Sequence, residues 1–335
     1  MGVIGVIIAV AIGNLSSIIV LAISSREKIR HEIQIKFLKK WFKLSWLPFY
    51  PGIAGMVHSY DVVVFSLIVG SVEGIAFWTA AILLPSLVAN SGLISTAVYP
   101  KLLKDGKMDN LKTNITQIFY FAFPLSAIVI VFAKPGLFIL NPIYQIAFPI
   151  VIIMTFQVVL NTLSTVFQST LKGIETVDVD EKSTFKQYIK SKLFFLPTLL
   201  LIQYSAYIIL LVIMLLTAPS DSNVIDLLVN WSIILLATQI PITICHYIMV
   251  RKNLQISLEK TIILKYLLIS IVVFGFIYYL IQEFLEYNTD IFIFLPNVIL
   301  LILIGTFSYI AITYMSDKRT KNLVSGIINE FKERF

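Results

Sequence analysis

The segment GMVHSYDVVVF, residues 55–65, places His58 and Asp61 inside an apolar run. The two residues are three positions apart, so on a helix they share one face. Counting from residue 44 places them about 20–26 Å along that helix. In a membrane, an ionisable side chain at this depth is costly unless it faces a cavity or a partner. Two interpretations follow: the pair lines a hydrated central cavity and binds a cation or proton, or it is a neutralised, mutually hydrogen-bonded pair that joins helices.

Other polar side chains interrupt the apolar stretches. Lys134 either contacts an anionic headgroup or extends from a helix end to the interface. Glu73 starts an apolar stretch, where a carboxylate suits the helix dipole and predicts a capping role, with a cavity role as the alternative. Amide side chains within two predicted spans either line a polar cavity or join helices by hydrogen bonds; they are Asn90, Gln157, Asn161 and Gln168.

The elements that carry these residues are membrane spans. The chain is 58% hydrophobic and 13% charged, far from the composition of soluble domains. A spanning helix needs about 20 apolar residues. The sequence therefore predicts an all-α polytopic membrane helix bundle of about nine transmembrane helices, at 2–23, 44–70, 74–97, 115–140, 142–170, 193–217, 224–250, 261–284 and 291–315.

The basic residues predict the orientation of these spans, because cytoplasmic loops collect Lys and Arg. Of the 26 Lys and Arg residues, Lys134 alone falls on the other set of loops. That set carries acids instead: Glu73, Asp221, Asp226, Glu283, Glu286 and Asp290. We expect a multi-pass protein of the cytoplasmic membrane with its N-terminus outside and its C-terminus in the cytoplasm. The net charge of +7 then reflects topology, and we expect no nucleic-acid partner.

Two segments near the N-terminus add detail. Residues 24–43 are basic, with apolar residues at about helical spacing, which predicts an amphipathic helix on anionic headgroups or an ordinary cytoplasmic loop. Pro48 and Pro51, followed by Gly52 and Gly55, predict a bent or broken helix at the start of the second span. Discontinuous helices of this kind are typical of transporter sites.

Motifs of nucleotide and metal chemistry are missing from the sequence. It has no GxxxxGK[ST] and no GxGxxG after a strand. Its single cysteine, Cys245, can form no internal disulfide, and its three histidines lack metal-ligand spacing. We therefore expect no catalytic residues, no metal site and no cofactor, and a protein that is not an enzyme.

Three features over residues 70–175 resemble a known family. A helix ends in YPKL at Tyr99, Pro100, Lys101 and Leu102. A turn carries Pro135, Leu137, Phe138, Tyr144 and Ala147, and a long helix ends in LKG at Leu171, Lys172 and Gly173. In this order they resemble the C-terminal half of the lipid-linked oligosaccharide flippases of the MOP superfamily, which are related to MATE exporters and lipid II flippases.

The resemblance implies a domain organisation and a function. Residues 1–23 resemble the sixth helix of a 14-helix member, the last helix of an N-terminal lobe that is otherwise missing. Residues 24–43 resemble the linker, 44–250 the six helices of the C-terminal lobe and 251–315 two additional helices, before a basic tail at 316–335. The implied activity is alternating-access transport of a lipid-linked oligosaccharide or polysaccharide precursor, in contact with membrane lipids and with glycan-assembly enzymes as partners.

Three alternatives remain open. A MATE-like exporter of drugs or cations would need an acidic cavity for hydrophobic cations. An integral-membrane glycosyltransferase or polymerase would need a large outer loop with paired acids or arginines, and the predicted outer loops are short. A membrane scaffold without transport activity is the third.

Overall fold

The computed structural model describes residues 3–26, 35, 46–97, 108–175, 177, 185–219, 221–254, 259–322 and 325. The chain forms two compact units, Met1–Phe49 and Tyr50–Phe335. The first contains α1 (Val3–Ser24), which carries no charged side chain. The predicted amphipathic segment 24–43 lies almost wholly outside the described residues.

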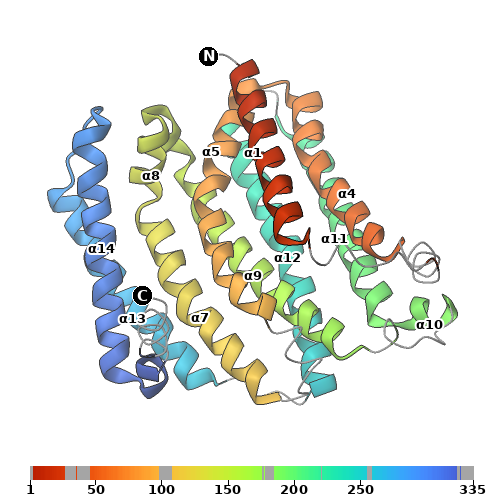
Figure 1. The fold of residues 1–335 in the computed structure, drawn as a ribbon. Coiled ribbons are helices and arrows are strands. Elements are labelled where there is room, and N and C mark those ends of the chain that lie inside the picture. The colour runs from red at the N-terminus through yellow and green to blue at the C-terminus, as the bar shows by residue number, and fades with distance from the viewer. Residues whose placement is uncertain are drawn as a thin grey trace. The chain divides into compact units, whose positions relative to one another are not determined.

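The second unit is an all-α membrane helix bundle (Figure 1). Its long helices are α4 (Trp46–Val69, which begins just before the unit), α5 (Val72–Ala89), α7 (Met108–Val131), α9 (Phe148–Gly173), α11 (Lys192–Thr217), α12 (Val224–Leu254), α13 (Lys260–Phe284) and α14 (Ile291–Ser316). Shorter helices are α8 (Ala133–Leu140), α10 (Phe185–Lys190) and the 3₁₀ segments η1 (Asn90–Ala97) and η2 (Pro142–Ala147).

Eight helices of the described part of the chain are long and apolar enough to cross a membrane. They correspond to the second to ninth predicted spans. The first predicted span corresponds to α1. Within it, the apolar helix found among the described residues, Ala11–Ser24, is shorter than a membrane span. Large apolar side chains are exposed on these helices, as on Leu67 of α4, Phe276 of α13 and Met315 of α14. Such a surface suits hydrocarbon rather than water.

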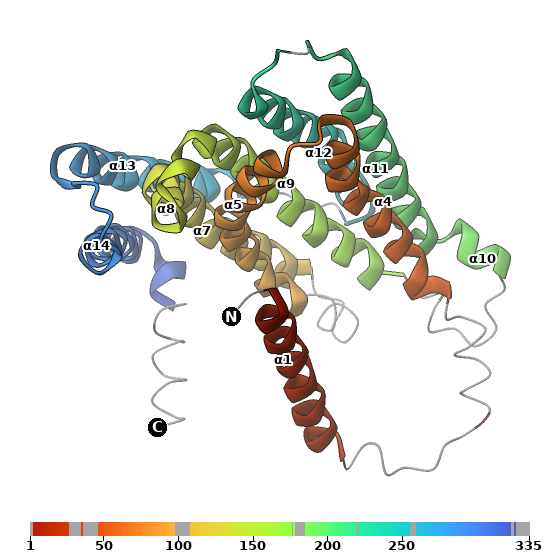
Figure 2. The ribbon, with the colours of Figure 1, turned by 90° about the horizontal axis from the view of Figure 1, so that it is seen from above.

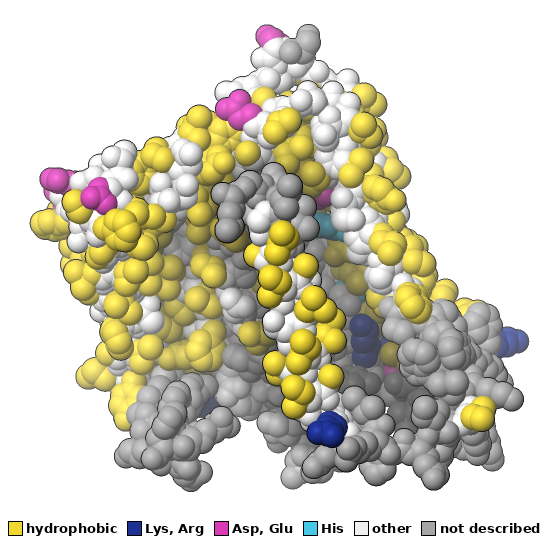
Figure 3. Space-filling model, turned by 45° about the horizontal axis from the view of Figure 1, so that its top comes forward, with side chains coloured by type: hydrophobic (Ala, Val, Ile, Leu, Met, Phe, Trp, Pro, Cys, Tyr) yellow, Lys and Arg dark blue, Asp and Glu magenta, His cyan; other side chains and the backbone are white. Residues whose placement is uncertain are grey.

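Charged side chains lie toward the ends of these helices. In Figure 3, yellow apolar side chains cover the middle of the second unit, and most of the visible acidic side chains lie along its upper edge. Asp226 is in the first turn of α12, and Arg251 and Lys252 are in its last turn. Apart from Asp61 within α4, the charged side chains of the described helices therefore lie near helix ends.

Proline decides where some helices end. Pro135 has no N–H to donate to the carbonyl of Val131, and its ring clashes with a continuing helix there. The predicted span 115–140 accordingly divides at Phe132 into α7 and α8. The predicted break at Pro48 and Pro51 does not occur, because α4 is one continuous helix through both. Pro48 falls in its first turn, where a backbone N–H has no helical partner to lose.

The helices pack in two groups. In the first, α9 lies along α12 and α5, and α11 packs on α12. A core of buried apolar residues joins them, and the indole of Trp231 on α12 stacks 3.9 Å from that of Trp78 on α5. In the second, α13 packs on α7 and α14 packs on α13 (Figure 2). Within Tyr50–Phe335 the structure shows one compact unit, with no division at residue 250, where the predicted lobe ends.

A tight turn joins α4 to α5. Gly70 has a φ of 66°, a conformation that glycine adopts without steric cost. Ser71 then caps α5, because its Oγ accepts a hydrogen bond of 3.0 Å from the backbone N–H of Gly74. This turn places Phe65 of α4 against Trp231 of α12, with their rings 5.1 Å apart. Asp61 lies on α4 four residues before Phe65, one helical turn away.

Candidate functional site

Asp61 is the one buried carboxylate among the described residues, with 5% of its surface exposed. Its Oδ2 accepts a hydrogen bond of 3.0 Å from the hydroxyl of Tyr207 on α11. That hydroxyl accepts a hydrogen bond of 2.5 Å from the indole N–H of Trp231 on α12. We call Asp61, Tyr207 and Trp231 the acid cluster. It ties three membrane helices together through a carboxylate, a phenol and an indole.

His58 lies beside this cluster. Its ring stacks on that of Tyr207 at 5.6 Å and meets the edge of Tyr204 at 4.8 Å. The sequence predicted that His58 and Asp61 lie on one face, and the structure brings both to Tyr207. No hydrogen bond joins the two residues among the described contacts. The mutual hydrogen bond of the second interpretation is therefore absent, but Asp61 does join helices, through its hydrogen bond with Tyr207.

A second polar group lies one turn along α11. Gln203 donates from Nε2 to Oε1 of Gln239 on α12 at 2.9 Å. Gln239 in turn donates to Oγ1 of Thr243 at 3.2 Å, and that hydroxyl donates to the carbonyl of Leu160 on α9 at 3.2 Å. Gln203 is 4% exposed, and its Oε1 has no partner. This amide pair joins α9, α11 and α12 and leaves one buried acceptor unused.

A third polar group joins α9 to α12. His246 is fully buried, and its Nδ1 lies 2.7 Å from Oγ of Ser164. Its Nε2 has no hydrogen-bond partner. Lys172, in the last turn of α9, interacts with His246 electrostatically. The structure therefore leaves one buried polar atom of His246 without a hydrogen bond among the described residues.

These groups lie at successive depths in the bundle. At 1.5 Å per residue, Trp231, Gln239 and His246 lie about 11, 23 and 33 Å from the start of α12 at Val224. We call the acid cluster, the amide pair and His246 together the polar ladder. It crosses most of the apolar thickness of the bundle. Since polar groups in hydrocarbon are costly and rare unless they have a role, the ladder is the strongest candidate for a functional site.

The ladder suits proton or cation handling. Asp61 is an acid with two of its acceptor positions occupied, and His246 is a base with one nitrogen free. Metal chemistry has no comparable support, because the described residues contain no group of three or more His, Cys, Asp or Glu side chains that could hold an ion. No residue set that would hold an organic cofactor stands out among them.

The other predicted site residues lie apart from the ladder or at its edge. Glu73 is exposed in the first turn of α5, where it suits the helix dipole. Asn90 is exposed at the C-terminal cap of α5. On α9, Gln157 is buried, Gln168 is half-buried and Asn161 is exposed. Lys134 is exposed on α8, and its ammonium lies 4.4 Å above the ring of Phe148.

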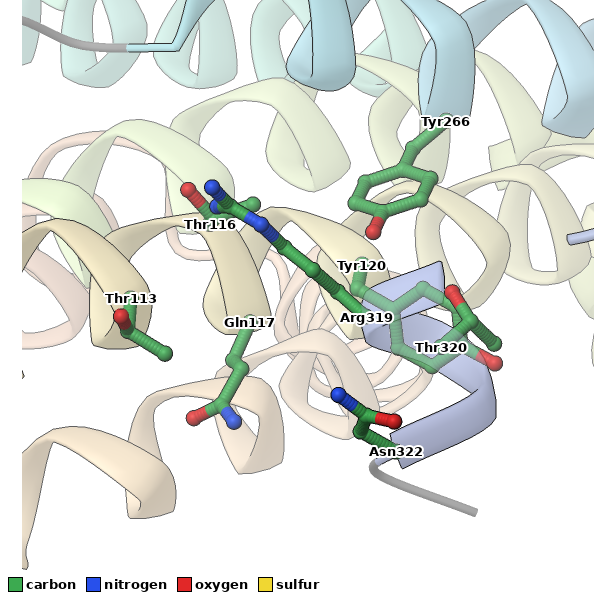
Figure 4. A pocket seen from close by; sticks show the side chains of 8 residues that line it. All are labelled: Thr113, Thr116, Gln117, Tyr120, Tyr266, Arg319, Thr320 and Asn322. Atoms are coloured by element: carbon green, nitrogen blue, oxygen red, sulfur yellow. The ribbon is translucent and has the colours of Figure 1, made fainter. Parts of the chain in front are cut away.

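A polar pocket of about 430 Å³ lies near the N-terminal parts of α7 and α13, and residues that follow α14 also line it (Figure 4). Arg319 reaches across it toward Thr116, and its two terminal nitrogens bind the carboxylate of Glu259. Asp317 lies two residues before Arg319. Partial burial raises the pKa of Asp317, but other effects outweigh it: the hydrogen bond of 2.5 Å from Tyr266, hydrogen bonds from backbone N–H groups after Asp317, and the charge of Lys265. The pKa of Asp317 therefore lies below the usual 3.8. The hydrogen bond to Glu259 raises the pKa of Arg319.

The residues of the turn motif form a packed hairpin. Pro135 and Leu137 lie on α8, and Tyr144 and Ala147 lie on η2. Leu137 and Ala147 are fully buried, and the ring of Tyr144 meets the edge of Phe77 at 5.7 Å. The motif therefore carries packing roles here. The YPKL residues lie outside the described part of the chain.

Most of the ladder was missed by the sequence analysis. In the sequence, Tyr207, Trp231, Gln203 and Gln239 are parts of apolar spans, and His246 is one of three histidines without metal-ligand spacing. A usable signal existed in the spacing, since Gln203 and Tyr207 are four residues apart on one helix face, as are Gln239 and Thr243. Nothing in the sequence alone could pair α11 with α12 or α4 with α11.

Comparisons with models of known families, with curated proteins and with solved structures found no match for this chain.

Proposed function

We propose that this protein is a transporter of the flippase type, which moves a lipid-linked oligosaccharide or polysaccharide precursor across the cytoplasmic membrane by alternating access. The observation that carries the proposal is the buried acid cluster, in which α4, α11 and α12 meet around Asp61. A carboxylate in the apolar interior is stable when protonated and unstable when charged. Its protonation can therefore be linked to the packing of three helices.

The substrate class rests on the resemblance of residues 70–175 to the MOP flippases. The orientation, with the N-terminus outside and the C-terminus in the cytoplasm, rests on the distribution of Lys and Arg. In this proposal the protein is not an enzyme, and Asp61, with His58 beside it, is the coupling-ion site. Partners are the glycan lipid, membrane lipids and glycan-assembly enzymes.

An exporter of hydrophobic cations is a second candidate, and the surroundings of Asp61 favour it. Three aromatic rings, of Tyr204, Tyr207 and Trp231, lie near the carboxylate and His58. Aromatic faces beside an acid attract organic cations. The two candidates differ in cargo, and a substrate test separates them.

Complementation tests the proposal. Cells that lack this gene would be supplied with the wild type, with Asp61→Asn, or with Asp226→Asn, which alters an exposed acid in the first turn of α12. We expect Asp61→Asn to abolish the surface glycan at an unchanged protein level in the membrane, while Asp226→Asn behaves as the wild type. Normal surface glycan with Asp61→Asn would rule the proposal out, and restored drug resistance in place of glycan would favour the exporter.

A further inference from the structure

A groove of about 540 Å³ opens on the second unit between α7, α8, α9 and α13. It is separate from the polar ladder, which lies among α4, α9, α11 and α12. Most of its lining is apolar, from Ala127 and Ile130 of α7 to Phe148 of α9 and Gly275 of α13. Lys134 of α8 also lines it. A groove with an apolar wall and one cation fits an amphiphile with a negative headgroup.

The depth of the groove matches one leaflet. Along α13 its lining begins at Ser270, near the middle of the helix, and reaches Gln282 near its end. Twelve residues of helix rise about 18 Å, and half of a hydrocarbon core is about 15 Å thick. The groove therefore extends from mid-membrane to the surface on the side of the α13–α14 turn, where Tyr287 also lines it. The lysine distribution places this side outside the cell.

The groove wall is open at Gly275. A Cβ built on Gly275 would meet no atom within 4 Å, whereas one built on Gly305 of α14 would lie 2.7 Å from Cε1 of Phe274. Glycine in membrane helices usually permits close helix packing, as at Gly305. At Gly275 no described atom fills the space, so the groove wall has room there for an apolar chain.

Lys134 is the one basic residue among the described residues that line the groove. It lies in the first turn of α8, seven residues before Asn141, or about 10 Å along the helix. Its contact with the ring of Phe148 fixes the ammonium over a ring face, and three N–H donors remain for an anion. The nearby acids Glu283 and Glu286 are not among the residues that line the groove. In the sequence, Lys134 is the only basic residue on this side of the membrane.

We propose that this groove is a binding site for an anionic phospholipid of the outer leaflet, with one acyl chain against Gly275 and the phosphate on Lys134. The proposal does not depend on the transported substrate. A phospholipid chain spans one leaflet, as the groove does. A long polyprenyl chain would extend beyond it.

Native mass spectrometry of the full chain in detergent tests the site, with phosphatidylglycerol and phosphatidylcholine of identical chains as probes. The variants are Lys134→Gln and Gly275→Leu. Their matched controls are Lys252→Gln at the other end of the bundle and Gly52→Leu, where a Cβ also meets no atom within 4 Å.

We expect the wild type to bind one phosphatidylglycerol about fivefold more tightly than phosphatidylcholine, the contribution of one lysine near a membrane surface. Lys134→Gln should remove this preference, Gly275→Leu should weaken binding of both lipids, and both controls should behave as the wild type. Equal binding of the two lipids by the wild type would overturn the proposal, as would wild-type binding by Lys134→Gln. Displacement of phosphatidylglycerol by an equal concentration of a polyprenyl phosphate would assign the groove to that lipid instead. None of these outcomes depends on transport. The role of Asp61 is tested separately, by the complementation experiment.

Discussion

At the scale of single residues, Tyr207 is the centre of the acid cluster. Its hydroxyl is the only side-chain donor to Asp61 among the described contacts, and it is also the acceptor for the indole of Trp231. Neither role is visible in the sequence, where Tyr207 looks like one more aromatic residue of an apolar span. The sequence identified Asp61 because a carboxylate is conspicuous in hydrocarbon, and it missed the phenol because a tyrosine is not.

Replacement of Tyr207 by Phe tests this role. The change leaves a buried carboxylate without one donor and a buried indole without its acceptor, which costs about 1–3 kcal/mol per group. We expect a clear fall in the thermal unfolding temperature of the detergent-purified protein, followed by tryptophan fluorescence. Tyr278→Phe, on an exposed tyrosine of α13, is the control and should change little. Equal unfolding temperatures for the two variants would show that the hydroxyl of Tyr207 contributes no stability.

Asp317 gives a prediction on pH. Its pKa in the folded state lies below 3.8, so ionised Asp317 contributes stability above pH 3.8 that is lost as the pH falls through the lower, folded value. Between these values the wild type should lose unfolding temperature more steeply than Asp317→Asn, and at neutral pH the variant should be the less stable. Asp221→Asn, on an exposed acid outside the spans, is the control. Parallel pH profiles for the wild type and Asp317→Asn would contradict the assignment.

At the scale of elements, proline and glycine set the details that a hydropathy profile cannot supply. Most of the eight spans of the second unit were predicted within a few residues because each is a long apolar run between polar loops, but the span predicted at 115–140 corresponds to Lys112–Val131. The division of 115–140 at Phe132 was not predicted, although Pro135 in its middle was a signal. A break was predicted at Pro48 and Pro51, but α4 continues through both. Pro48 lies in the first turn, where no helical hydrogen bond is lost, whereas Pro51 lies inside the helix and is accommodated there.

The α13–α14 contact depends on Gly305. A Cβ there would lie 2.7 Å from Cε1 of Phe274, whose side chain is buried. We expect Gly305→Ala to destabilise the protein by about 1–3 kcal/mol through overpacking. Gly275→Ala on the facing helix adds the same methyl group to open space and should be neutral or stabilising by up to about 1 kcal/mol. Unfolding temperatures of the two variants in one detergent measure the difference, and a Gly305→Ala variant as stable as Gly275→Ala would refute the close approach.

At the scale of the whole molecule, composition and charge predicted the class of fold and left the pairing of helices open. Apolar length alone decides that a segment spans a membrane. Which helix packs on which depends on side-chain shape across the bundle, as in the stack of Trp78 on Trp231. The polar ladder depends on that pairing, so only Asp61 of the ladder, with its neighbour His58, was predicted as a site. The substrate class has no signature in the helix packing.

The predicted orientation can be measured with single cysteines. In a Cys245→Ala background, a cysteine in place of Asp221 lies on the loop between α11 and α12, and one in place of Lys318 follows α14. We expect a membrane-impermeant maleimide to label the Asp221→Cys variant in intact cells and the Lys318→Cys variant only after permeabilisation. The reverse pattern would invert the topology and place Lys134 on the cytoplasmic side.

The most direct test of the central claim, that Asp61 couples ion binding to lipid transport, is a flipping assay in proteoliposomes. The wild type, Asp61→Asn and Asp226→Asn would be reconstituted with a fluorescent polyprenyl-linked oligosaccharide, and a membrane-impermeant reductant would report how much probe each leaflet holds. We predict that the wild type and Asp226→Asn move the probe between leaflets and respond to a pH gradient, while Asp61→Asn does neither. If Asp61→Asn moved the probe between leaflets as much as the wild type does, or if the wild type did not move it, the account would be contradicted.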